Sequence, residues 1–419
     1  MTTTNDKSKH YSRPAFLLLA ILFFLWGVAN NMTGSLLQDF RYSLGLSDIQ
    51  ESVIKSAFYV AYLFAALPAV MYLYSRHSYK SCIMLGLMLY AFGALLFFPA
   101  ASMESYIAYI VAIYVMATGC AVLETVANTY IIASAPSHDK GVVRLNLAQS
   151  FNPLGSVLGI VLCQYLIIDN ISYDSNAVNN PEVIREELDS ITMVYAGVGE
   201  ILLVFLVLAV FVNIPYISNV TIGRRAGELR QSLGRLMRKG SFVRGALALF
   251  VYMGAQAGVW GYTIPAINEQ GEGFDAQVLY LCSMSAFAVS RFLFTWLMGH
   301  FRYPKLLLMS SILALLLTIA VILCSGVWMV ASLIGISCCM SLMFATIFGM
   351  SLEDTGRDVQ TGGAILVMTI AGGALLLTLQ GYLSRTLNAQ MSYILPALCF
   401  LGVVTYSAFA LLLSDKKSN

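Results

Sequence analysis

The stretch SNVTIGRRAGELRQSLGRLMRKGSFVR, residues 218–244, divides the chain into two long apolar parts. It carries seven arginines and lysines and a single acid, Glu228, whereas the sequence on either side consists mainly of apolar runs. The whole chain of 419 residues is 58% hydrophobic and only 11% charged. A soluble domain carries about 25% charged residues, which form its polar surface. The composition therefore indicates a protein whose surroundings are largely lipid.

Twelve apolar runs are long enough to cross a bilayer, because a helix needs roughly 20 apolar residues to span the hydrocarbon layer. Helices are expected, since backbone groups in lipid must be satisfied within the spanning segment. The runs are residues 14–37, 52–74, 81–100, 105–133, 145–168, 191–217, 245–267, 276–299, 306–325, 326–352, 361–384 and 391–413. We predict an all-α membrane protein with twelve transmembrane helices in two six-helix bundles, residues 1–217 and 245–419, joined by the basic linker at 218–244.

The distribution of basic residues predicts the orientation. Of the 24 lysines and arginines, 19 fall on the side shared by both termini and the linker, and three fall on the other side. Cytoplasmic loops carry the excess of positive charge. We therefore expect a multi-pass protein of the cytoplasmic (inner) membrane with both termini and the linker in the cytoplasm. The acidic loop 169–189 is expected to be a solvated segment on the opposite side.

Three charged residues lie clearly inside the predicted spans, where each costs at least ~2.5–3.5 kcal/mol and is therefore a functional candidate. Glu124 is expensive when ionised and tolerable as a neutral acid, so we expect it to carry a proton; the alternative is a static carboxyl bonded to neighbouring helices. For Glu200, structural pairing is favoured over a coupling role. Arg291 keeps its proton, and we expect a structural or gating ion pair, or else contact with the substrate.

Neutral amides and tryptophans accompany these charges on four of the spans. They are Trp26, Asn30 and Asn31 on the first, Asn128 on the fourth, Gln149 and Asn152 on the fifth, and Gln256 and Trp260 on the seventh. An amide offers both a donor and an acceptor, which suits sugar hydroxyls, and an indole offers an apolar face. Any one amide can instead join two helices. The clustering favours a small neutral polyol as the ligand.

Several classes of function are disfavoured. The phosphate-binding loop of ATP-driven transport is absent, and no nucleophile–base or metal set occurs at recognisable spacing. We therefore expect no enzyme, cofactor or metal site. The net charge of +2 gives no basis for nucleic-acid binding. The expected partners are a monosaccharide, protons and the lipid bilayer, with the chain working as a monomer.

Motifs along nearly the whole chain resemble the L-fucose–proton symporter family of the major facilitator superfamily. They are FFLWGVANN (23–31), LETVANTY (123–130), RLNLAQSFNPLG (144–155), YMGAQAGVW (252–260), SRFLFTWL (290–297), VMTIAGG (367–373) and ILPALCF (394–400). The resemblance implies the major facilitator fold, alternating access and symport of a monosaccharide with protons. It implies that Glu124 is the sugar-coupled proton carboxylate, and that the amides of the fifth and seventh spans line the cavity.

One position departs from that family. There the first span continues from the two asparagines to an Asp in the cavity, whereas this chain has Gly34. Either Glu124 alone couples the proton, another group substitutes, or coupling is weak. We predict proton-coupled uptake of a neutral monosaccharide, L-fucose or a related hexose. The alternatives are a drug–proton antiporter of the same superfamily and a membrane sugar sensor that does not transport.

Overall fold

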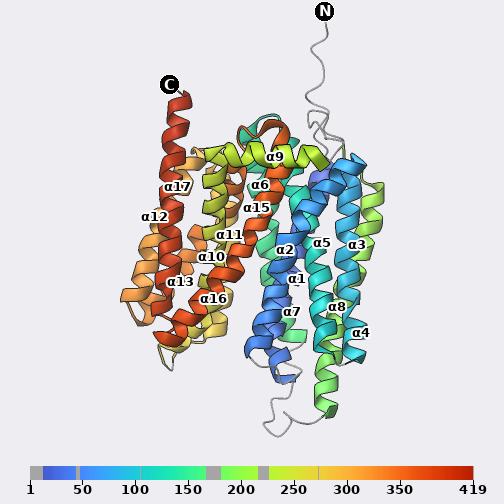
Figure 1. Ribbon diagram of the computed structural model, residues 1–419. Helices are drawn as coiled ribbons and strands as arrows, with labels where there is room; N and C mark the ends of the chain where they lie inside the picture. Colours follow the sequence, from blue (N-terminus) through green and yellow to red (C-terminus); the bar gives the residue numbers. More distant parts are fainter. Residues whose placement is uncertain are drawn as a thin grey trace, which may run out of the picture.

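The computed structural model describes residues 13–43, 48–103, 105–166, 181–215, 226–271 and 273–418. Within these ranges the regular elements are all helices, as predicted (Figure 1). The first set comprises α1 (Arg13–Ser43), α2 (Asp48–Arg76), α3 (Tyr79–Leu95), α4 (Phe97–Ser102), α5 (Tyr106–Ala133), α6 (His138–Gln149), α7 (Phe151–Leu166) and α8 (Pro181–Phe211).

After α9 (Ala226–Arg238) comes the second set of helices. It comprises α10 (Gly240–Asn268), α11 (Ala276–Leu297), α12 (Tyr303–Leu323), α13 (Gly326–Met340), α14 (Met343–Ser351), η2 (Gly356–Asp358), α15 (Val359–Met368), η3 (Thr369–Ala371), α16 (Gly372–Thr386), η4 (Met391–Tyr393) and α17 (Ile394–Ser418). In the described residues, 11 segments are long and apolar enough to cross a membrane, and α1 adds a shorter apolar segment over Arg13–Val28. The prediction of twelve transmembrane helices is confirmed.

Four of the predicted spans are interrupted rather than continuous. The fifth, for example, consists of α6 and α7, which meet at Ser150. Pro153 lies in the first turn of α7, where the absent N–H of proline would have had no helical partner. The same kind of break separates α3 from α4, α13 from α14, and α15 from α16.

Several helices begin earlier than hydropathy predicts. Helix α6 starts at His138 instead of residue 145, because the side chain of Ser137 caps it by accepting a hydrogen bond from the backbone N–H of Lys140. Helix α8 starts at Pro181 instead of residue 191, so the predicted acidic loop 169–189 is helical from residue 181; residues 167–180 lie outside the described part. The linker ends at α10, which starts at Gly240 rather than 245. Polar first turns explain the early starts of α6 and α8.

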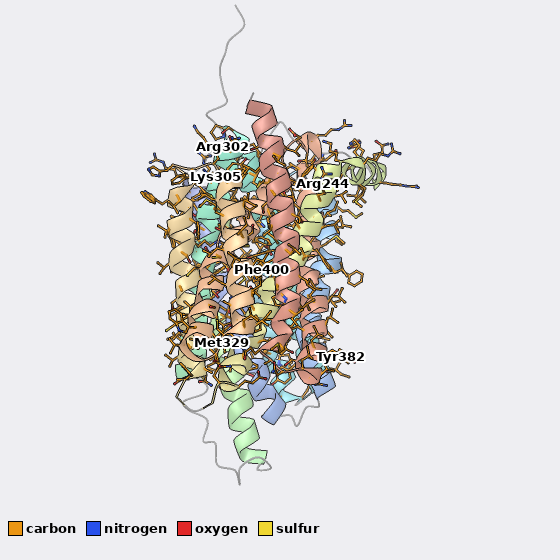
Figure 2. All side chains as sticks on the ribbon, turned by 90° about the vertical axis from the view of Figure 1, so that its left-hand side faces the viewer. Arg244, Arg302, Lys305, Met329, Tyr382 and Phe400 are labelled. Atoms are coloured by element: carbon orange, nitrogen blue, oxygen red, sulfur yellow. The ribbon has the colours of Figure 1, made fainter. Side chains whose placement is uncertain are left out.

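The helices run roughly side by side, and α9 lies across one end of the bundle, near the place where α17 ends (Figure 1). We call this the linker end. Arg244, Arg302 and Lys305 lie toward the linker end, whereas Met329 and Tyr382 lie near the opposite end (Figure 2). Three of the basic side chains that predicted the orientation therefore lie on the side of α9.

Helices α1 and α7 pack with their backbones in contact. A Cβ atom at Gly155 would overlap the carbonyl oxygen of Phe24, and one at Gly159 would overlap that of Val28. From α1, a Cβ at Gly27 would overlap the carbonyl oxygen of Asn152. Glycine is needed at these positions because no side chain fits between the two helices.

Candidate functional site

Two polar side chains of α5 lie in the middle of the first set of helices. Glu124 is 2% exposed and Asn128, one turn along the helix, is fully buried. Both therefore point into the protein and not toward lipid. Oε2 of Glu124 and Nδ2 of Asn128 belong to neighbouring groups, but neither atom makes a hydrogen bond of good geometry to any described residue. Buried polar atoms are nearly always paired, so these two atoms mark a place for a proton, water or ligand.

A chain of hydrogen bonds leads from Asn128 to the second set of helices. Nε2 of Gln149, at the end of α6, donates to Oδ1 of Asn128 at 2.9 Å. The guanidinium of Arg291 on α11 donates to Oε1 of Gln149 at 2.7 Å. Three predicted site residues and Glu124 are thus brought together by α5, α6 and α11.

Arg291 does not form the ion pair predicted for it. The side chain is 5% exposed, its hydrogen-bond acceptor is the neutral amide of Gln149, and its Nε atom has no hydrogen-bond partner among the described residues. The guanidinium lies 5.7 Å from the centre of the Phe287 ring, which offers a cation–π contact. Among the described residues no acid lies within ion-pair distance of Arg291. An amide and an aromatic ring thus stand where the sequence led us to expect an acid.

An aromatic cluster borders this site from α1 and α2. Trp26 stacks on Tyr62 with ring centres 6.3 Å apart, and Phe58 lies 5.1 Å from Tyr62. Nε1 of Trp26 and the hydroxyl of Tyr62 are buried neighbours, and neither has another hydrogen-bond partner among the described residues. Sequence analysis missed Tyr62, because one tyrosine within an apolar run cannot be distinguished from a core residue.

The seventh-span residues lie on α10, in the second set of helices. Nε1 of Trp260 donates to the hydroxyl of Ser337 at 3.3 Å, and its ring packs edge-on against Phe287 at 5.0 Å. Ser337 also hydrogen-bonds Ser283 at 2.7 Å. Gln256 is half-buried. The N–H of Trp260 is therefore paired within its own helix set, whereas that of Trp26 makes no hydrogen bond of good geometry to a described residue.

The remaining predicted amides contact the backbone. Asn152 on α7 donates to the carbonyl oxygen of Phe23 on α1 at 3.1 Å, and Asn31 donates to that of Gly27 at 3.2 Å. Asn152 therefore joins two helices, which is the alternative to sugar binding that the sequence left open for each amide. The side chain of Asn30, like residues 32–56 that include Gly34, lies outside the described side chains.

Hydrogen bonds join the two helix sets from the linker end to the Gln149–Arg291 contact. They are Tyr74–Thr361 at 2.6 Å, Gln360–Tyr79 at 2.7 Å, Tyr303–Asp139 at 2.8 Å, His138–Gly349 at 3.0 Å, Asn146–Thr346 at 3.3 Å and Ser150–Thr295 at 3.4 Å. The two sets are therefore in contact through the half of the molecule on the linker side.

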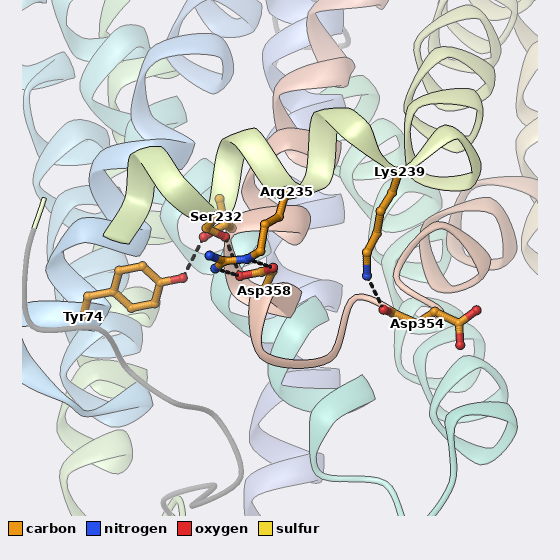
Figure 3. Close-up of polar contacts among 7 residues, drawn as sticks. Tyr74, Ser232, Arg235, Lys239, Asp354 and Asp358 are labelled. Carbon is orange, nitrogen blue, oxygen red and sulfur yellow. Dashed lines mark hydrogen bonds and ion pairs between the residues drawn. The ribbon is translucent and has the colours of Figure 1, made fainter. Parts of the chain in front are cut away.

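Helix α9 adds a polar contact on the surface of the linker end (Figure 3). Arg235 binds Asp358 through two hydrogen bonds, at 2.9 and 2.6 Å, and Ser232 donates to the same carboxylate at 2.9 Å. The bond to Asp358 raises the pKa of the Arg235 guanidinium above its ordinary value. Nζ of Lys239 donates to the carbonyl oxygen of Asp354 at 2.6 Å. We call these four contacts the α9 latch.

A cavity of about 1020 Å³ opens at the linker end. Lys140 and Arg144 of α6 line it, with Arg244 and Arg302 from the second set of helices. None of the predicted site residues lines this cavity, so it is distinct from the cluster around Glu124.

Glu200 has no partner among the described residues, in contrast to the pairing expected from the sequence. Its side chain is exposed on the outer face of α8, and no described residue forms a hydrogen bond or ion pair with it.

Comparison with known proteins decides the family. The family model described as Major Facilitator Superfamily matches residues 17–377. This chain belongs to the Major Facilitator Superfamily. It is 34% identical to the L-fucose-proton symporter of Escherichia coli (strain K12), over 96% of this chain and 94% of that protein. It is 28% identical to a glucose/galactose transporter of Brucella abortus biovar 1 (strain 9-941), over 96% and 95% of the two chains.

The superfamily fold is also found among solved structures. A crystal structure of the superfamily transporter FucP in the outward conformation matches with a TM-score of 0.84 and 32% identity, over 95% of this chain and 99% of that chain. The proton:xylose symporter XylE matches with a TM-score of 0.74 over 94% of both chains, but at 12% identity it shows the fold alone. The resemblance stated from the motifs is confirmed. The chain is a multi-pass membrane protein of a transporter superfamily, not an enzyme.

Proposed function

We propose that this chain carries a neutral monosaccharide, L-fucose or a related hexose, into the cell together with protons. The observation that carries the proposal is the buried Glu124, whose unpartnered oxygen lies on the same helix face as Asn128 and within a network that reaches both helix sets. The two relatives are named a symporter for L-fucose and protons and a transporter for glucose and galactose, which supports a sugar as the substrate.

In this mechanism Glu124 binds a proton from outside and becomes neutral, which removes the penalty of a charge inside the membrane. Sugar hydroxyls then pair with polar atoms that lack partners, including Nδ2 of Asn128 and Nε1 of Trp26. Gln256 and Trp260 form the facing wall. These roles are carried over from the motifs and supported by the burial of the residues concerned.

Release requires the linker side to open. We propose that residues 1–217 and 245–419 move as two bodies and that the linker end faces the cytoplasm, consistent with its lysines and arginines. Opening there must break the contact of Arg291 with Gln149, which is an inter-set bond. Arg291 therefore acts as a gating charge. Its partner Gln149 also hydrogen-bonds Asn128, so the gate is connected to the proton and sugar site.

Because Gly34 takes the place of the family's first-span acid, we propose that Glu124 is the single coupling carboxylate. One charge moving across 100 mV supplies roughly 2.3 kcal/mol, which supports accumulation of about fifty-fold. Sugar uptake into proteoliposomes with an imposed proton gradient measures this directly.

The deciding variant is Glu124→Gln, which mimics the neutral acid and cannot release a proton. We expect accumulation against a gradient to disappear, while exchange of labelled for unlabelled sugar continues. The matched control is Glu200→Gln, a second carboxyl at mid-membrane depth that lies outside the site, and it should accumulate sugar normally. If Glu124→Gln still concentrates sugar, Glu124 is not the coupling residue.

The same assay separates the alternatives. A protein that binds sugar but neither accumulates nor exchanges it is a sensor. A protein that expels lipophilic cations in exchange for protons and ignores monosaccharides is a drug antiporter. Either result would replace symport as the function of this chain.

A further inference from the structure

Two glycines near the linker end of the second helix set lie directly against side chains of the first set. A Cβ atom built at Gly349 on α14 would lie 2.7 Å from a methyl group of Val142 on α6. One built at Gly363 on α15 would overlap the methyl group of Thr129 on α5. Carbon atoms that are not bonded pack at about 3.5–4.0 Å. Neither position therefore has room for a side chain while the two sets touch.

A third glycine, Gly373, lies against the first set at the start of α16. A Cβ atom there would come within 2.8 Å of the ring of Tyr59 on α2. With a rise of 1.5 Å per residue, Gly373 lies about 15 Å farther from the linker end than Gly363, in keeping with the order of α15 and α16 along the bundle (Figure 1). We call the contacts of Gly349, Gly363 and Gly373 the glycine contacts.

Hydrogen bonds between the two sets flank the glycine contacts. Nε2 of His138 donates to the backbone carbonyl oxygen of Gly349 at 3.0 Å. Nε2 of Gln360, three residues before Gly363, donates to the hydroxyl of Tyr79 at 2.7 Å. Such bonds weaken steeply as the distance grows. A side chain at either glycine would push the two sets apart and lengthen these bonds.

The glycine contacts also adjoin the candidate site. Thr129 directly follows Asn128 on α5. The ring of Tyr59 packs edge-on against Phe58 at 5.9 Å, and Phe58 in turn lies 5.1 Å from Tyr62 of the aromatic cluster. The residues that meet the glycines are therefore next to residues that we assign to the proton and sugar site.

Backbone conformation does not explain these glycines. None of the three has a positive φ angle, so a residue with a side chain could adopt the same backbone. Gly349 and Gly363 lie inside helices, where alanine is the better helix former. What glycine supplies at these positions is the close approach of the first set.

We propose that the three glycines are positioning residues, which set the balance between the state seen here, closed on the linker side, and the state open on that side. This inference rests on the movement of two bodies proposed above. A methyl group added at a glycine contact is crowded only while the sets touch, because opening removes its neighbour. Since a contact present in one of two states shifts their ratio, alanine there should disfavour the closed state.

The test measures the separation of the two sets by pulsed electron paramagnetic resonance on the full chain in phosphatidylcholine vesicles. Spin labels attached through a genetically encoded keto amino acid replace Ser75 and Arg357, which are exposed on the first and second sets, so the native cysteines remain. Gly363→Ala should raise the ratio of long to short distances about tenfold. The measurement needs neither sugar nor a proton gradient, so it remains decisive if the proposed symport is wrong.

The neighbouring glycine supplies the matched control, Gly362→Ala. A Cβ at Gly362 would also meet a side chain at 2.8 Å, but that side chain is Leu352 of the same set, so the crowding is present in both states and the ratio should not change. Thr129→Ser supplies the rescue. Serine lacks the methyl group but keeps the hydroxyl that donates to the carbonyl oxygen of Thr125 at 2.8 Å. Combined with Gly363→Ala, it should restore the ratio of the unmodified chain.

The contact at Gly349 repeats the experiment and decides it if Gly363→Ala does not fold. Gly349→Ala should open the linker side, and adding Val142→Ala should close it again. Four outcomes would overturn the proposal. They are an unmodified chain found only in the open state, alanine variants with unchanged distances, equal opening by Gly362→Ala, and double variants that stay open. A glycine with a merely structural role would change thermal stability and leave the ratio of distances as it is.

Discussion

The α9 latch and the cluster around Glu124 both consist of polar groups in an otherwise apolar molecule, yet they differ in how these groups are paired. In the latch, the carboxylate of Asp358 accepts bonds from Arg235 and Ser232. In the cluster, one oxygen of Glu124 and the amide nitrogen of Asn128 are buried without a partner. The latch, in which Asp358 and Ser232 are buried, is the fully paired region, and the cluster around Glu124 is the incompletely paired one.

The difference separates contacts that hold a conformation from groups that await a ligand. An unpaired buried polar atom costs about 1–3 kcal/mol. A protein that keeps several such atoms in one place gives up stability there, as functional sites commonly do. The inter-set bonds of the linker half, by contrast, stabilise the state in which the two helix sets touch on that side.

The largest expected effect comes from breaking the hydrogen bond between Gln149 and Arg291, which joins the cluster around Glu124 to the second set of helices. Gln149→Leu removes the acceptor of Arg291 and leaves a buried cation unpaired, so we expect a loss of about 3 kcal/mol in unfolding free energy together with the loss of transport. Thermal unfolding of the purified protein measures the first effect and vesicle uptake the second.

The double variant Gln149→Leu with Arg291→Leu is the control for that experiment. Since it removes both partners, it should recover most of the stability without recovering transport. If the double variant is as unstable as the single one, the bond between Gln149 and Arg291 is not the source of the effect.

Replacing Trp26 or Trp260 by phenylalanine should give effects of intermediate size, and the two variants can be compared directly. Trp26→Phe removes an N–H whose one polar neighbour among the described residues is the Tyr62 hydroxyl, a contact of poor hydrogen-bond geometry, so stability should change by less than about 0.5 kcal/mol while sugar affinity falls about tenfold. Trp260→Phe removes the bond to Ser337, so it should lower stability by about 1 kcal/mol. Equilibrium sugar binding and thermal unfolding distinguish the two. Equal stability losses would mean that the N–H of Trp26 is paired in the native state.

The smallest effect is expected at the latch. Asp358→Asn weakens two hydrogen bonds of Arg235, whose side chain is 36% exposed, so the loss should stay under about 1 kcal/mol after solvent screening. Backbone amides of α9 should nevertheless exchange hydrogen faster. Glu228→Gln on the same helix is exposed and makes none of the latch contacts, so it should exchange at the normal rate. Equal exchange in both variants would show that Asp358 does not hold α9.

The architecture was predictable because lipid imposes a simple rule on sequence. Runs of apolar residues identified the twelve helices, and the stretch at 218–244 separated them. The starts of α6 and α8 were not predictable from hydropathy, since residues such as Lys140 continue a helix beyond the apolar layer. Caps and tertiary contacts decide those boundaries.

The sequence predicted which residues belong to the site better than it predicted which of them bond to each other. Glu124 and Arg291 stood out because charge is rare inside a membrane. That Arg291 would bind Gln149 depends on which side chains two distant helices bring within reach, which one sequence does not contain. In the sequence, Glu200 and Glu124 are both acids within an apolar run. Only the structure, which places Glu200 on the outer face of α8, distinguishes them.

The backbone contact between α1 and α7 restricts how the first set of helices can deform. With no side chain between them at Gly27, Gly155 and Gly159, neither helix can twist or shift without striking the other. The pair is therefore a stiff two-helix unit, and we expect Trp26 to keep its distance from the residues of α7 when the helix sets move. Elastic adjustment during the cycle must then fall on other joints, such as the break between α6 and α7 at Ser150.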